Sequence, residues 1–99
     1  MKIEFHPDAV NELIAAAQYY EEQQIQLGKR FLDSIDEALS FLKQNPSIWR
    51  PDHLGRRKQR VKQFPYLIIY KYEREQIDVL AIAHAKRKPG YWKARDTNE

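Results

Sequence analysis

Basic and aromatic side chains gather in two stretches of this 99-residue chain. The first stretch has five cations: Arg56, Arg57, Lys58, Arg60 and Lys62. The second stretch begins at a histidine and continues through cations and aromatic rings: His84, Lys86, Arg87, Lys88, Tyr91, Trp92, Lys93 and Arg95. Guanidinium groups hold phosphates and aromatic rings stack on bases, so these residue types suit RNA or DNA. The two stretches together predict a surface that binds an anionic target.

Five of these residues are also candidates for RNA cleavage without a metal. Such a reaction needs a base for the ribose 2′-OH, cations beside the phosphate, and an acid for the leaving 5′ oxygen. His84 or Tyr91 could supply the acid or the base, and Arg60, Lys62 and Arg87 could stabilise the phosphate. A structural alternative stays open, because a histidine that closes a strand often serves only as a hydrogen-bonding group.

The other eight candidates are assigned to target binding: Arg56, Arg57, Lys58, Lys86, Lys88, Trp92, Lys93 and Arg95. Each has a simpler reading as well, since short basic runs are common and a tryptophan can cover the end of a core. The prediction depends on the two basic stretches occurring together.

Other kinds of chemistry find no support in the sequence. There is no cysteine, and the three histidines are far apart, so no metal-ligand spacing occurs. The three glycines are isolated, which excludes a glycine-rich phosphate loop, and no serine stands in a nucleophile elbow. We therefore expect neither a metal nor a cofactor.

Charge is distributed unevenly along the chain. Residues 1–49 carry four basic and eight acidic side chains, a net charge of −4. Residues 50–99 carry thirteen basic and six acidic side chains, a net charge of +7, which together gives the overall +3. Such asymmetry indicates a surface that meets an anionic partner, although a solvated charged face would produce the same pattern.

Hydrophobic periodicity predicts a short strand followed by two helices. Polar and apolar residues alternate over residues 2–6, as in a strand, and Pro7 suits the first turn of a helix. Two stripes of helical spacing follow: Val10, Leu13, Ile14, Ala17 and Tyr20, then Phe31, Leu32, Ile35, Ala38, Leu39 and Leu42. A polar break at residues 23–28 separates them, and Asn45-Pro46 ends the second. The two helices should form an antiparallel hairpin.

Beyond a loop predicted at residues 46–55, the period of the sequence pattern changes from the 3.6 of a helix to the two of a β-strand. Three runs are typical of strands: residues 56–63, 66–72 and 77–85. The predicted fold class is α+β with the order β-α-α-β-β-β, an antiparallel sheet, the helix hairpin on one face and a short C-terminal segment. The other face should be partly free to display the basic alternation. One domain is expected over residues 1–99, with a disordered tail at 96–99.

The chain has no apolar run long enough to span a membrane, and its N-terminus does not resemble a signal peptide. We therefore expect a cytoplasmic protein without a membrane partner.

Two short blocks resemble the RelE/ParE superfamily of bacterial type II toxins, also known as plasmid-stabilisation or addiction-module toxins. They are Phe64-Pro65-Tyr66, at the start of an apolar strand, and His84-Ala85-Lys86-Arg87-Lys88-Pro89, followed by Trp92 and Arg95. The chain length and the order of elements match as well. The resemblance implies a small growth-inhibiting toxin that a cognate antitoxin protein neutralises. It would meet operator DNA only indirectly, through that antitoxin.

The resemblance leaves the target open between two branches. ParE-like members inhibit DNA gyrase, whereas RelE-like members cut messenger RNA in the ribosome. Arg60, Lys62 and Arg87 resemble the RelE-like pattern, but Lys93 stands where that branch has a tyrosine. The two blocks are closer to the ParE-like style, so gyrase inhibition is the first expectation and RNA cleavage the second. A third alternative is a non-toxic module that binds the antitoxin for autoregulation.

Overall fold

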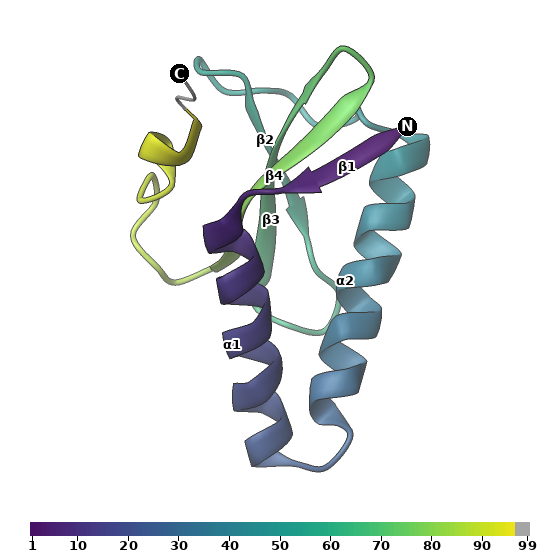
Figure 1. Ribbon diagram of the computed structural model, residues 1–99, viewed down its shortest axis with the longest axis vertical. Helices are drawn as coiled ribbons and strands as arrows, with labels where there is room; N and C mark the ends of the chain where they lie inside the picture. The colour runs from purple at the N-terminus through teal and green to yellow at the C-terminus, as the bar shows by residue number, and fades with distance from the viewer. Residues whose placement is uncertain (97–99) are drawn as a thin grey trace.

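The computed structural model of the protein describes residues 1–96, and its elements follow the order predicted from the sequence (Figure 1). The elements are β1 (Lys2–Phe5), α1 (Pro7–Gln23), α2 (Leu27–Gln44), β2 (Arg56–Arg60), β3 (Tyr66–Glu73), β4 (Gln76–His84) and the 3-10 helix η1 (Lys93–Asp96). This small α+β domain confirms the predicted fold class. Within the expected tail 96–99, Asp96 ends η1, and residues 97–99 lie outside the described part of the chain.

The sheet has the strand order β1-β4-β3-β2. The last three strands form the predicted antiparallel meander. However, β1 lies parallel to β4, with Lys2 opposite Gln76 and Phe5 opposite Val79, so the expected antiparallel pairing is corrected for this strand. A parallel pair needs a long crossover connection, which the helix hairpin begins. Since β1 pairs only as far as Val79, no strand among the described residues flanks this side of β4 beyond it.

Local sequence explains where α1 begins and how closely the two helices pack. Pro7 opens α1, and the Nδ1 atom of His6 accepts a hydrogen bond from the amide of Asp8 at 3.0 Å, which caps the helix. In α2, Gly28 lies against α1 so closely that a Cβ atom there would be 2.6 Å from the carbonyl oxygen of Ala17. The glycine that the sequence offered as the end of a polar break is therefore a contact between helices. None of the helices in residues 1–96 is long and apolar enough to cross a membrane.

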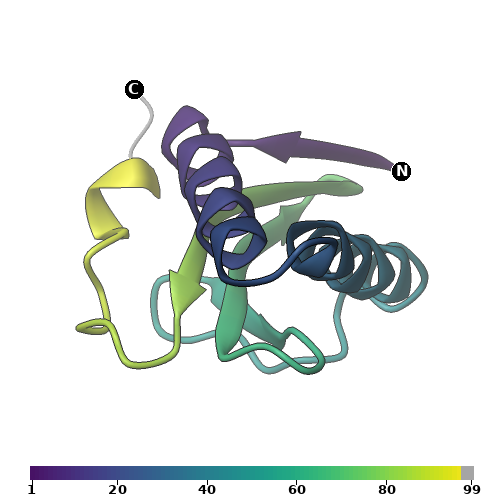
Figure 2. The ribbon, with the colours of Figure 1, turned by 90° about the horizontal axis from the view of Figure 1, so that it is seen from below.

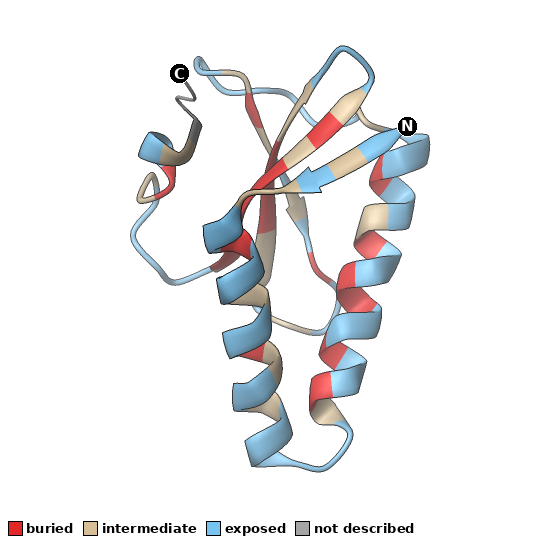
Figure 3. Cartoon of the chain, viewed as in Figure 1, coloured by how far each residue is buried: buried red, intermediate tan, exposed pale blue. Residues whose placement is uncertain are grey.

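The main core lies between the helix hairpin and one face of the sheet. In Figure 3 the buried positions of α2 form a stripe along the helix, and Phe31, Ile35, Ala38 and Leu42 are buried as the periodicity predicts. The stripe predicted for α1 is corrected: Ala9 and Ala16 are its buried residues, whereas Val10 and Ile14 are exposed. Four aromatic rings pack together between the hairpin and the sheet, where the fully buried Phe31 contacts the partly buried Tyr20, Phe64 and Tyr66. The Phe-Pro-Tyr block thus contributes two of the rings that join α1, α2 and the sheet.

A second, smaller core covers the opposite face of the sheet. Trp92 is only 5% exposed and packs with Ile69, Leu80, Ala81 and Ala83. Figure 2 shows the C-terminal segment and α2 on opposite sides of the strands. This face is therefore less open than the sequence predicts, because residues 91–96 occupy part of it.

Candidate functional site

The register of β2 decides where its cations point. Lys58 lies opposite Ile69, whose side chain belongs to the small core beneath Trp92. Successive side chains of a strand point to opposite faces, so Arg56, Lys58 and Arg60 share that face. Arg57 instead points toward the helix side.

Two of the predicted target-binding arginines donate hydrogen bonds to backbone carbonyl oxygens of this chain. Arg56 is 4% exposed, and its Nη2 donates to the carbonyl oxygen of Lys93 at 3.0 Å. Arg57 donates from Nη1 to the carbonyl oxygens of Ser47 (3.2 Å) and Trp49. These guanidinium groups fasten the C-terminal segment and the loop between α2 and β2.

Three cations near the end of β2 remain exposed: Lys58, Arg60 and Lys62. The Nζ of Lys58 lies 5.7 Å from the centre of the Trp92 ring, a cation–π distance. The Nζ of Lys62 is 3.5 Å from an Oε atom of Glu37, but both of these side chains are mostly exposed. Such solvated contacts are weak and leave the cations available to a partner.

At the end of β4, His84 has a local structural contact. Its Nδ1 accepts a hydrogen bond from the amide of Lys86 at 3.0 Å, and its ring packs edge-on against Tyr66. The neighbouring Lys86, Arg87 and Lys88 are exposed. His84 therefore shapes the turn that presents three cations.

Glu12 of α1 is a site residue that the sequence interpretation missed. Its Oε1 accepts hydrogen bonds from the amide of Ile82 (2.9 Å) and Nη1 of Arg95 (3.0 Å). Its Oε2 accepts from the hydroxyl of Tyr91 (2.8 Å) and Nη2 of Arg95 (3.0 Å). Glu12 shares its helix face with the buried Ala9 and Ala16, three residues before it and four after. The signal available in the sequence was a glutamate at helical spacing between two alanines.

Tyr91, a candidate acid or base, is held by that carboxylate. Burial and the hydrogen bond to Glu12 raise the pKa of Tyr91 to about 12. The guanidinium carbon of Arg87 lies 3.6 Å from the centre of the Tyr91 ring. The phenol therefore stays protonated at neutral pH and supports Arg87 as a stacking surface.

The remaining candidates of the C-terminal segment divide into buried and exposed groups. Trp92 is buried, as is most of Arg95, whose Nη1 also donates to the carbonyl oxygen of Leu80 at 3.0 Å. Lys93 is exposed. Trp92 and Arg95 thus attach the segment to the sheet, and Lys93 is the cation that this part of the segment displays.

The structure places the two exposed basic groups at the same end of the sheet. Arg60 lies opposite Leu67, which lies opposite Ala83, the residue before His84. Two strand spacings of about 4.8 Å separate the backbones of Arg60 and Ala83 by roughly 10 Å. The predicted convergence of the two stretches thus applies to Arg60, Lys62 and the turn that carries Arg87, but not to the buried Arg56 and Arg95.

Two grooves adjoin these cations. One, of about 310 Å³, lies between α2 and β2 and is lined by Phe41, Trp49, Arg60 and Lys62 among others. Phe41 and Trp49 are both well exposed for such large apolar side chains. The second groove, of about 220 Å³, lies beside α1 and includes His84 and Arg87.

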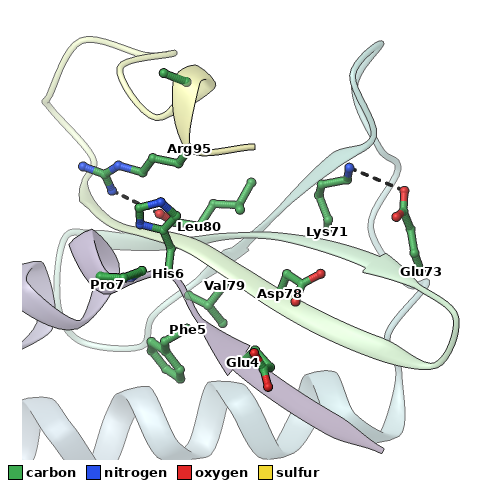
Figure 4. A pocket seen from close by; sticks show the side chains of 11 residues that line it. Glu4, Phe5, His6, Pro7, Lys71, Glu73, Asp78, Val79, Leu80 and Arg95 are labelled. Atoms are coloured by element: carbon green, nitrogen blue, oxygen red, sulfur yellow. Dashed lines mark hydrogen bonds and ion pairs between the residues drawn. The ribbon is translucent and has the colours of Figure 1, made fainter. Parts of the chain in front are cut away.

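A larger polar pocket lies away from the exposed cations, next to β1 and the C-terminal segment (Figure 4). Its volume is about 490 Å³, and it mixes the carboxylates of Glu4, Glu73 and Asp78 with the cations of Lys71 and Arg95. The Nζ of Lys71 is 3.5 Å from an oxygen of Glu73. The mixed charge favours neither an anion nor a cation, and residues 1–96 contain no cluster suited to a metal ion.

The pKa of Tyr91 predicts a loss of stability at alkaline pH. A tyrosine in an unfolded chain has a pKa near 10, so between about pH 10 and 12 the unfolded chain releases this proton and the folded chain keeps it. The contribution is complete below pH 10 and is lost as pH rises through 12. Urea unfolding across this range should show a smaller decline for Tyr91→Phe, whereas Tyr72→Phe, on β3 and away from Glu12, should keep the wild-type decline. Equal declines in the free energy of unfolding for all three proteins would show that Tyr91 does not cause the alkaline loss of stability.

Comparison with known proteins identifies the family. The family model for the ParE toxin of the type II toxin–antitoxin system parDE matches residues 3–89. A solved structure described as a chromosomal ParDE TA system from P. aeruginosa superimposes with a TM-score of 0.73 at 21% identity, covering 87% of this chain and 97% of its own. At that identity the likeness shows the fold alone. No curated protein matches the chain significantly in sequence. The resemblance noted in the sequence is thus confirmed: the chain belongs to the ParE toxin family of type II toxin–antitoxin systems.

Proposed function

We propose that this chain is a toxin that a cognate antitoxin protein neutralises, and that it inhibits DNA gyrase by binding to it. The observation that carries the choice of gyrase is the state of the acid–base candidates. Nδ1 of His84 accepts the Lys86 amide, and the Tyr91 hydroxyl is bound to Glu12 with a raised pKa. Inhibition by binding requires no free acid or base, only a surface. The site of action would be the cytoplasm, where gyrase works.

The exposed cations are the proposed target-binding surface. Lys58, Arg60 and Lys62 line the end of β2, and Arg87 with its two lysine neighbours lines the turn after β4. A cluster of positive charges attracts anionic partners and raises the rate of association. The target region on gyrase is therefore expected to be acidic or to carry bound DNA.

The groove between α2 and β2 supports the antitoxin part of the proposal. It combines the exposed rings of Phe41 and Trp49 with the cation of Lys62, which lies near Glu37 of α2, and it is bordered by Arg60. An antitoxin segment that carries apolar side chains next to acidic ones would complement both the exposed rings and the positive charge of the groove. An antitoxin bound there would also cover Lys62, one of the proposed target-binding cations, and so compete with the target.

Ribosome-dependent RNA cleavage is the second candidate. The observation in its favour is that Arg60, Lys62 and Arg87 are exposed at one end of the sheet, near His84. In that mechanism these three cations would stabilise the phosphate, and His84 would move the proton in place of Tyr91.

Parallel assays of the purified chain test both candidates. We expect inhibition of gyrase supercoiling and no new messenger RNA ends in cell-free translation. Arg60→Ala with Arg87→Ala should weaken inhibition about tenfold, which corresponds to roughly 1.4 kcal/mol of binding. Arg74→Ala, in the turn at the other end of the sheet, is the control and should have no effect. Ribosome-dependent message cleavage with unaffected gyrase would replace the first candidate by the second, and no effect on either would indicate the non-toxic module.

A further inference from the structure

The half of β4 that β1 does not reach is closed by side chains. Beyond Val79, the amide of Ile82 and the carbonyl of Leu80 face the side on which β1 would have continued. The carboxylate of Glu12 accepts from that amide, and the guanidinium of Arg95 donates to that carbonyl. An ion pair thus makes the hydrogen bonds that a neighbouring strand would make.

The geometry of this ion pair is specific. Glu12 and Arg95 form two parallel hydrogen bonds of 3.0 Å, and their side chains are 15% and 14% exposed. With Ile82 and Tyr91 added, four donors reach the two oxygens, which fills the acceptor capacity of a carboxylate. Bidentate contacts between charged groups fix orientation as well as distance. Glu12 therefore joins α1, β4 and the C-terminal segment at one point.

An exposed cation of the proposed target surface depends on this arrangement. The Arg87 side chain is 55% exposed, its guanidinium stacks on the Tyr91 ring, and its Nη1 is 3.6 Å from Oε2 of Glu12. The hydroxyl that holds this ring in place is the one bound to Glu12. The largely buried carboxylate of Glu12 therefore determines the direction in which Arg87 points, through the Tyr91 ring that it holds.

We infer that Glu12 is a positioning residue: it holds the segment of Tyr91 and Arg95 on the open half of β4 and thereby orients Arg87 toward the target. Glu12 does not itself contact the target. The inference rests on the proposed function only in so far as Arg87 belongs to the target-binding surface.

The test combines a structural and a functional measurement on Glu12→Gln in the full chain. For the emission measurement alone, Trp49→Phe serves as the background, so that Trp92 is the only remaining tryptophan, and proteolysis and inhibition are measured with Trp49 in place. We expect the Trp92 emission to shift to the red, trypsin to cut faster after Lys86 and Arg87, and the inhibitory concentration against the target to rise about tenfold. Glu22→Gln makes the same charge change at an exposed position of α1 and should change none of the three.

Two other results would overturn the inference. Lost inhibition with unchanged Trp92 emission and proteolysis would mean that Glu12 acts on the target directly. A released segment with full inhibition would mean that the segment does not orient the target surface. If Glu12→Gln does not fold, Tyr91→Phe, which removes one of the four donors, replaces it with the same expected directions. If the wild-type chain inhibits neither gyrase nor translation, the proposed function fails, and the emission and proteolysis measurements still decide whether Glu12 holds the segment.

Discussion

Replacing Glu12 with alanine is expected to lower the free energy of unfolding by about 3 kcal/mol, because it leaves the largely buried guanidinium of Arg95 without its carboxylate. The same change removes the acceptor for the amide of Ile82 and the hydroxyl of Tyr91. For a chain of this length the loss corresponds to a fall in the melting temperature of roughly 12–24 °C. Urea and thermal unfolding measure both quantities.

The control for this substitution lies on the same helix. Glu22→Ala removes an identical side chain from an exposed position of α1, and its effect should stay within about 0.5 kcal/mol of zero. Similar effects of the two substitutions would show that the Glu12 contacts contribute no net stability.

The second large effect is expected at Phe31. This ring is fully buried, with the ring centres of Tyr20, Phe64 and Tyr66 at 5.3, 5.2 and 5.1 Å. Phe31→Ala should therefore cost about 3–5 kcal/mol, from lost burial and from the cavity that remains. Chemical denaturation provides the measurement.

The neighbouring residue supplies a matched comparison. Leu32 occupies the next position of α2 but is well exposed, so Leu32→Ala should cost less than about 1 kcal/mol. If the two substitutions cost the same, the aromatic cluster would not be the joint between the hairpin and the sheet.

The elements of the fold were predictable because their signals are local. Helical stripes, the proline at the start of α1 and the period-two runs each depend on residues a few positions apart. The parallel pairing of β1 was not predictable in this way. It depends on Lys2 reaching Gln76 across the whole molecule, and alternation within residues 2–6 does not reveal which neighbour the strand takes or in which direction.

The residue types of the candidate site were predictable from the sequence, but which of these residues lie on the surface was not. Arg60 and Arg87 are exposed cations, whereas Arg56 and Arg95 have the same side chain and are largely buried by contacts with distant segments. The difference arises from strand register and from the path of the C-terminal segment. Neither is encoded in the spacing of the charges.

The register of β1 also has a consequence for how the chain is made. Lys2 pairs with Gln76, and Glu12 with Arg95, so the first strand and the first helix have partners that are synthesised long after them. During synthesis the helix hairpin can form from its own neighbours, but the sheet cannot be completed and Glu12 has no counter-ion. Contacts this distant in sequence make folding slow relative to a helix hairpin alone. The growing chain therefore lacks its finished basic surface until translation of the message has reached Arg95.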